Sequence, residues 1–124
     1  MIKVVMFFKR REGLSAEEFR DYYETKHVKL FDGLRETAGV ERYVRRYLTP
    51  IADPIAGIVR PSGFDVVMEL WFSTREVFET HFKGTQDPKF RAIVEADEAR
   101  LFDRSQIYAN IVDEVDTDLQ RPAP

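Results

Sequence analysis

Cysteine is absent from the 124 residues, and only two histidines occur. The absence of cysteine excludes thiol catalysis, cysteine-ligated zinc and iron–sulfur clusters, and it favours a reducing compartment, so we expect a cytoplasmic protein. No His/Asp/Glu cluster has metal-ligand spacing, and glycine-rich phosphate motifs, dinucleotide motifs and a nucleophile elbow are missing. The sequence therefore predicts neither a bound metal nor a cofactor.

An excess of basic residues is also missing, because the chain has 19 Lys and Arg residues and 22 Asp and Glu residues, and the two kinds are well mixed along the sequence. This balance argues against nucleic acid as a partner. The apolar run at 4–8 is too short for a signal peptide or a membrane span, so no membrane association is expected. Aromatic residues are abundant instead, at 13% with ten phenylalanines. They indicate a well-filled core with an aromatic-lined cavity.

Capping signals and apolar periodicity set the order of the elements. Ser15 and Glu18 form a capping box, Ser73 and Glu76 repeat it, and Asp87-Pro88 is typical of a helix start. The expected elements are a strand at 4–8, a helix from 15 to 33, strands at 40–48 and 64–72, helices at 73–82 and 87–101, and a strand at 106–112. This βαββαβ order predicts an α+β, ferredoxin-like domain over residues 1–113, followed by a polar arm at 114–124.

The predicted sheet carries apolar residues on both faces. In the first strand Val5 and Phe7 oppose the other apolar residues, and Val67 and Trp71 do the same in the third. Helices cover only one face, and an uncovered apolar face forgoes about 25 cal/mol per Å². A homodimer is expected, the alternative being a monomer with the connector 49–63 or the tail folded beneath. The connector carries four aliphatic residues and is expected to lie over an apolar surface.

The candidate catalytic residues are His27, Tyr23 and Glu69. His27 lies on the apolar stripe of the first helix, one turn after Tyr23, where its pKa can be tuned for acid–base work; alternatively it is a core histidine with satisfied nitrogens. Glu69 in the middle of a strand either pairs with a cation such as Arg45 or has a pKa raised by burial. His81 is a weaker candidate, because its apolar neighbours are typical of ordinary helix packing.

Further polar side chains are expected to surround a shared cavity or to edge the core. The candidates for substrate binding are Tyr43, Tyr47, Trp71, Tyr108, Asn110 and His81. The hydroxyls in this set would orient a phenol, enol or carbonyl. The acidic run of Asp97, Glu98 and Asp103 is interpreted as a solvated helix face.

Four segments together resemble the EthD family, in order along nearly the whole chain. They are VVMFFKR through GLSxEEFxDYYxxxH at 4–27, GVxRY at 39–43, FDxxxELWF at 64–72 and DEARxFD at 97–103. The resemblance implies a dimeric α+β barrel and points to His27, Glu69 and Trp71 as functional positions. One departure is Lys29, where the family usually has proline. We expect it to lengthen the helix and place a positive charge near the pocket mouth, either for an anionic substrate or without consequence.

The resemblance implies a cofactor-free lyase acting on an aromatic or polyketide-like carbonyl compound, in a catabolic or secondary-metabolism pathway. The reaction would be a dehydration, a decarboxylation or a retro-aldol cleavage. His27 would be the general base or acid, Tyr23 or Tyr43 a hydroxyl donor, and Glu69 would orient the imidazole. The alternatives are a non-catalytic module that binds or carries a hydrophobic small molecule, and a cofactor-free monooxygenase.

Overall fold

An antiparallel sheet of four strands is the base of the fold in the computed structural model, which describes residues 1–82 and 87–120 apart from the side chains of Leu34 and Thr37. The strands are β1 (Ile2–Phe8), β2 (Val40–Tyr47), β3 (Val66–Phe72) and β4 (Tyr108–Ile111), in the order β2-β3-β1-β4. β1 pairs with both β3 and β4, and β2 pairs with β3. This arrangement confirms the predicted α+β, ferredoxin-like fold.

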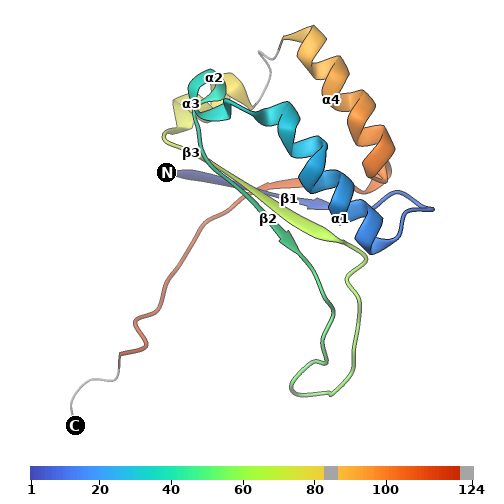
Figure 1. Ribbon diagram of the computed structural model, residues 1–124. Helices are drawn as coiled ribbons and strands as arrows, with labels where there is room; N and C mark the ends of the chain where they lie inside the picture. The colour runs from blue at the N-terminus through green and yellow to red at the C-terminus, as the bar shows by residue number, and fades with distance from the viewer. Residues whose placement is uncertain (83–86, 121–124) are drawn as a thin grey trace.

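The helices gather on one side of this sheet (Figure 1). They are α1 (Ala16–Thr25), η1 (His27–Phe31), α2 (Leu34–Ala38), α3 (Arg75–His81), α4 (Pro88–Leu101) and η2 (Arg104–Gln106). α1 and α4 run side by side over the sheet, while α2 and α3 lie together at one of its ends. The elements therefore form two layers, one of helices and one of strands.

The capping signals predict two of the helix starts correctly and miss a third by one residue. Ser15 accepts from the Glu18 amide at 3.0 Å, and the Glu18 carboxylate accepts from the Ser15 amide at 3.0 Å, which confirms the first capping box. Asp87 caps α4 through the Lys89 amide, as predicted. The second box is wrong, because Thr74 rather than Ser73 caps α3, by accepting from the Val77 amide at 3.2 Å.

The first helix is shorter than the sequence pattern predicts. It ends at Thr25, because Lys26 leaves the helical region (φ −121°, ψ −60°), and the chain continues as the 3₁₀ segment η1. Gly33, with φ +79°, closes that segment. The expected lengthening of the helix through Lys29 is therefore wrong.

The core lies between the sheet and the helices and is dominated by aromatic rings. Phe8 and Phe102 stack with their centroids 4.2 Å apart, and Phe19 and Tyr23 of α1 pack edge-on against Phe102. A second cluster, formed by Val4, Val40, Phe72 and Phe78, lies beneath α3. The rich aromatic content thus fills the space under the helices.

The opposite face of the sheet carries no helix in the described part of the chain, and it is less uniformly apolar than predicted. Trp71 lies between two cations, with Lys3 Nζ 3.9 Å and the Arg42 guanidinium 4.6 Å from its ring centroid. Glu69 accepts from the Trp71 indole N–H at 2.5 Å and pairs with Arg46. We call this surface the open face; it combines apolar residues with a row of charges.

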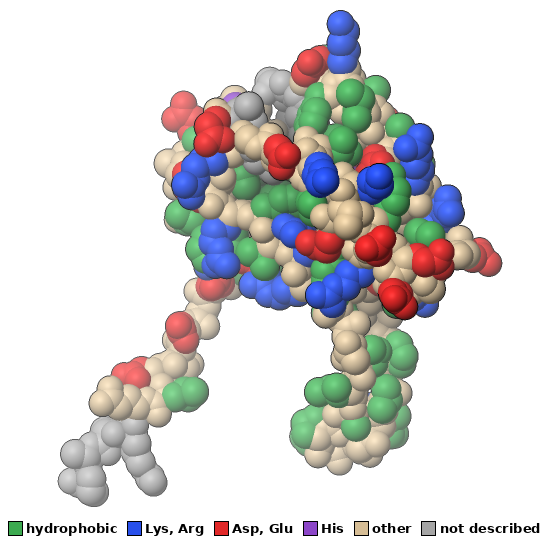
Figure 2. All heavy atoms as spheres, viewed as in Figure 1, with side chains coloured by type: hydrophobic (Ala, Val, Ile, Leu, Met, Phe, Trp, Pro, Cys, Tyr) green, Lys and Arg blue, Asp and Glu red, His purple; other side chains and the backbone are tan. Residues whose placement is uncertain are grey.

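The connector between β2 and β3 extends away from the sheet as a finger, and the C-terminal segment extends separately (Figures 1 and 2). Ile51 and Ile55 of the finger are 79% and 96% exposed, so the prediction that the connector lies over an apolar surface is wrong for one protomer. The finger is internally ordered, since Ala52 pairs with Val59 and Asp53 accepts from the Ile55 and Ala56 amides. Neither the finger nor the C-terminal segment as far as residue 120 covers the open face.

Candidate active site

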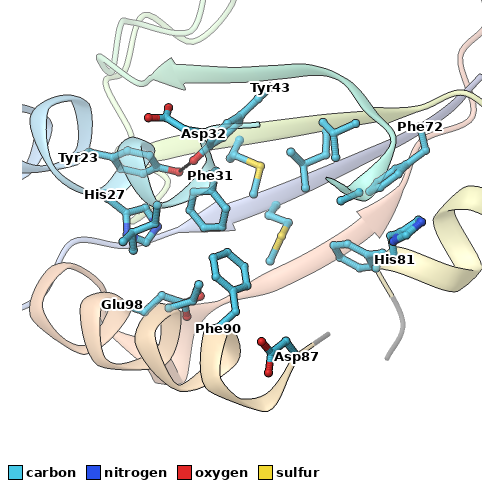
Figure 3. A pocket seen from close by; sticks show the side chains of 18 residues that line it. Tyr23, His27, Phe31, Asp32, Tyr43, Phe72, His81, Asp87, Phe90 and Glu98 are labelled. Carbon is cyan, nitrogen blue, oxygen red and sulfur yellow. Dashed lines mark hydrogen bonds between the residues drawn. The ribbon is translucent and has the colours of Figure 1, made fainter. Parts of the chain in front are cut away.

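A cavity of about 630 Å³ lies between the helical layer and the sheet. The sheet supplies apolar side chains including Met6, Met68 and Leu70, while Phe31 of η1 and Phe90 of α4 meet edge-on with their centroids 6.1 Å apart. Figure 3 shows these two rings pointing toward each other in the middle of the site. The polar residues of the wall are Tyr23, His27, Asp32, Tyr43, His81, Asp87 and Glu98.

His27 of η1 is held by a carboxylate from α4. Its Nδ1 lies 2.7 Å from Oδ2 of Asp97, and the residue is only 3% exposed. Asp97 also accepts from the Tyr22 hydroxyl at 2.6 Å. Because an ionised carboxylate only accepts, Nδ1 carries the proton in the neutral ring and Nε2 carries the lone pair. Nε2 makes no hydrogen bond with the described residues, and the ring borders the cavity.

The protonation states of this pair follow from burial and hydrogen bonding. Burial lowers the pKa of His27, and the attraction of Asp97 offsets only part of that effect. Burial by itself raises the pKa of Asp97, but the hydrogen bonds from Tyr22 and His27 outweigh it and the net pKa is lowered. The pair therefore rests as neutral imidazole beside carboxylate, the state that a general base requires.

Two tyrosine hydroxyls meet beside the imidazole. The Tyr43 hydroxyl donates to that of Tyr23 at 3.4 Å, as Figure 3 shows. Burial raises the pKa of Tyr43 to about 12 and that of Tyr23 well above its ordinary value. Both therefore remain neutral hydrogen-bond donors. The long Tyr43–Tyr23 distance marks a weak bond that a substrate oxygen can replace.

Glu98 and Asp97 are the candidate site residues that the sequence interpretation missed, because it placed them on a solvated face. Glu98 points from α4 toward the cavity (Figure 3), and burial raises its pKa, which favours the protonated form. The signal was present in the spacing: Val94, Asp97, Glu98 and Leu101 lie at i, i+3, i+4 and i+7, one inward stripe of a helix. Asp103, in contrast, lies outside the cavity and caps η2.

The structure brings together only some of the predicted site residues. His27, Tyr23, Tyr43 and His81 all line the cavity. Tyr47 does not, because its hydroxyl donates to Glu24 at 2.5 Å.

The remaining predicted site residues lie on the open face. Glu69 is paired in register with Val5, and Trp71 lies two residues further along the same strand. Tyr108 and Asn110 pair with Phe7 and Val5 and so share that face. Strand alternation put these four on the face opposite His27, so their assignment to the pocket is wrong.

The partners of the charged residues also differ from the prediction. The cation beside Glu69 is Arg46, whereas Arg45 lies on the helix side and binds Glu24 through two nitrogens at 2.6 and 3.0 Å. Burial by itself raises the pKa of Glu69, but the hydrogen bonds from Trp71 and Arg46 outweigh it and the net pKa is lowered. Of the two alternatives for Glu69, pairing with a cation therefore holds and a pKa raised by burial does not. Lys29 is not among the described residues that line the cavity.

Residues 1–82 and 87–120 contain no group of three or more His, Asp or Glu side chains placed to hold a metal ion. The same residues contain no helix with the length and apolar character needed to cross a membrane.

Comparison with known proteins supports the resemblance read from the sequence. The EthD domain family model matches residues 11–105, and a search of curated proteins found no match. An EthD family protein from Bacillus halodurans superposes with a TM-score of 0.61 at 15% identity, covering 93% of this chain and 99% of that one. SnoaB from Streptomyces nogalater, a cofactor-independent oxygenase, gives 0.55 at 14% identity and 97% of both chains. A dimeric ferredoxin-like protein of unknown function from Bacteroides fragilis gives 0.51 at 14% identity, with 90% and 91% covered.

Proposed function

The chain belongs to the EthD family, and we propose that it is a cofactor-free lyase acting on an aromatic or polyketide-like carbonyl compound. One observation carries the proposal: the buried His27 is fixed through Nδ1 by Asp97, its Nε2 has no hydrogen-bond partner among the described residues, and its ring borders an aromatic-lined cavity. The arrangement is that of a general base whose tautomer is set by a carboxylate. Such a base contributes about 10²- to 10⁴-fold to a proton transfer.

The neighbouring groups fit an elimination beside a carbonyl. Nε2 of His27 takes the proton from the carbon next to the carbonyl, and the Tyr43 hydroxyl donates to the carbonyl oxygen as negative charge develops there. The electron pair of the broken C–H bond then forms the carbon–carbon double bond while the C–O bond of a β-hydroxyl breaks. Glu98 gives a proton to the departing oxygen, which leaves as water. Retro-aldol cleavage would use the same base and donor, with Nε2 deprotonating the β-hydroxyl.

We also propose that two copies of the chain pair through the open face. Val5, Phe7 and Val67 lie there, and no helix, finger or tail residue among those that the structure describes covers them in the same protomer. The finger adds exposed aliphatic residues such as Ile55, which would bury apolar area against a second copy. Sedimentation velocity should show a dimer, and Phe7→Glu should convert it to a monomer while circular dichroism stays unchanged. A monomeric wild-type protein at micromolar concentration would refute the pairing.

The catalytic proposal is tested by replacing His27. A panel of aromatic β-hydroxy ketones is incubated with the protein, and the conjugated product is followed by its absorbance and by mass loss of one water. His27→Gln should abolish turnover while the melting temperature and the oligomeric state stay close to wild type. Tyr47→Phe is the matched control, because it removes a hydroxyl outside the cavity and should retain activity.

The other outcomes would either overturn the role of His27 or indicate a different function. Full activity of His27→Gln would overturn the role of the imidazole. A ligand that raises the melting temperature yet returns chemically unchanged would indicate a binding or carrier module instead. Oxygen uptake at an electrode, coupled to loss of the substrate, would indicate a cofactor-free monooxygenase.

A further inference from the structure

The charged groups of the cavity wall are all of one sign among the described residues. Asp32, Asp87 and Glu98 line the cavity, and no Lys or Arg of the described residues does. Asp32 and Asp87 are exposed and therefore lie where the cavity opens, whereas Glu98 is partly buried deeper inside (Figure 3). An entering ligand thus passes two carboxylates first and then meets the carboxyl group of Glu98, whose raised pKa favours the protonated form.

Arg45 does not offset this charge. The Arg45 guanidinium lies 4.8 Å from the ring centroid of Tyr43, outside the cavity wall, and both its Nε and Nη2 bind Glu24. That carboxylate neutralises it. His27 adds no positive charge either, because burial lowers its pKa and Asp97 holds the neutral ring through Nδ1.

We infer that the cavity selects against anions, so that the substrate carries no carboxylate, phosphate or sulfate in the form that binds. An anion held here would lie near the carboxylates of Asp32 and Asp87 without a cation of the described chain to pair with, and the apolar part of the wall weakens solvent screening. A neutral aromatic ring meets only favourable surfaces, namely Phe31, Phe90 and the sheet methionines. Nε2 of the buried His27, which has no hydrogen-bond partner in the part of the chain that the structure describes, marks the place where such a molecule binds.

The inference rests on the proposed function in one respect, namely that the substrate binds in the cavity beside His27. It also reduces the number of reactions that the cavity favours. Decarboxylation starts from a carboxylate, which this wall repels. Dehydration and retro-aldol cleavage start from an uncharged hydroxy carbonyl compound. The cavity therefore favours these two reactions. The interpretation of Lys29 as a partner for an anionic substrate falls with the same observation, because Lys29 does not line the cavity.

The test compares 2-naphthamide with 2-naphthoate, two planar probes of nearly equal shape that differ by one charge. Their dissociation constants are measured by isothermal titration at pH 7.5, with no turnover required. The naphthoate should bind about tenfold more weakly or worse, as expected for like charges within roughly 8 Å at an effective dielectric near 20. Asp32→Asn with Asp87→Asn should reduce that ratio at least about threefold. Glu98→Gln replaces a carboxyl group whose raised pKa favours the protonated form, so it should leave the ratio close to that of the wild type.

The matched control is Glu17→Gln with Asp21→Asn, which makes the same change of net charge on the exposed side of α1 and should leave the ratio unchanged. Naphthoate binding as tightly as naphthamide would overturn the inference, as would binding of neither probe up to its solubility limit. The same titration in His27→Gln separates the two proposals. If His27→Gln keeps its activity, the lyase mechanism is overturned and the charge preference stands. If the variant loses its activity and binds both probes equally well, the charge preference is overturned and the lyase mechanism stands.

Discussion

Replacing Asp97 with asparagine should change the tautomer of His27 without removing the ring. The Nδ1–Oδ2 distance of 2.7 Å is that of a charge-assisted hydrogen bond, and the two side chains are only 4% and 13% exposed. An asparagine can present its amide N–H₂ to Nδ1 instead. The imidazole proton then moves to Nε2, and the lone pair that faces the cavity is lost. The exchange leaves the volume of the core unchanged.

The expected losses of stability and of turnover follow from the kind of hydrogen bond that is lost. A hydrogen bond to a charged group contributes about 1.5–3 kcal/mol, and the new amide contact recovers part of it, so the free energy of unfolding should fall by about 1–2 kcal/mol. Turnover should fall by about 10²- to 10⁴-fold because the base is no longer available. The pKa of His27 should fall further below its ordinary value, since Asp97 is the group that opposes the effect of burial.

Nitrogen-15 NMR of the histidine rings is the decisive assay, and the chain has only two of them. His81→Gln assigns the signals. At pH 8 the wild-type His27 should show a protonated Nδ1 and an unprotonated Nε2, and Asp97→Asn should reverse the pattern. Asp21→Asn serves as the charge-matched control and should resemble wild type. A wild-type ring protonated on Nε2, or an unchanged pattern in Asp97→Asn, would refute the reasoning.

Three further predictions concern stability. Leu101→Ala, at a side chain with no exposed area, should lower the free energy of unfolding by about 2–5 kcal/mol in urea titrations, whereas a loss under 1 kcal/mol would contradict its core position. Gly39→Ala should cost about 1–3 kcal/mol, because φ is +66° and the added Cβ would lie 2.4 Å from Val77 Cγ1. Val77→Ala in the same chain should restore the steric part of that loss, and no restoration would rule out the clash. Burial lowers the pKa of His27 below 6.5, so its stabilising contribution is complete above that pH and is lost as pH falls. Relative to His27→Gln, the wild type should therefore lose stability between pH 7.5 and 5.5, and a constant difference in melting temperature would contradict this.

Local chemistry determined much of the fold from the sequence alone. The Ser15–Glu18 box and the Asp87-Pro88 pair each act within four residues, so the starts of α1 and α4 are readable without any tertiary contact. The order of strands and helices follows from apolar periodicity and predicts the antiparallel sheet. The shortening of the first helix was not readable, because the chain leaves the helix at Lys26 without a glycine or proline there.

The sequence pattern predicted only part of the candidate site. His27 and Tyr23 share one helical stripe by their spacing, and Asp97 and Glu98 share another, but the two stripes are 70 residues apart and nothing local shows that they meet. Packing of α4 beside α1 creates that meeting and sets the tautomer of the imidazole.

The tertiary structure also decided which apolar face of the sheet faces the cavity. Alternation showed that Glu69 and Trp71 point away from Met68 and Leu70. It did not show which of those two faces the helices would cover, since both carry apolar side chains. The helices cover the face that carries Val4, Met68 and Leu70, and the open face therefore lies on the opposite side of the sheet from His27. A strand pattern defines two faces, but only packing against other elements tells them apart.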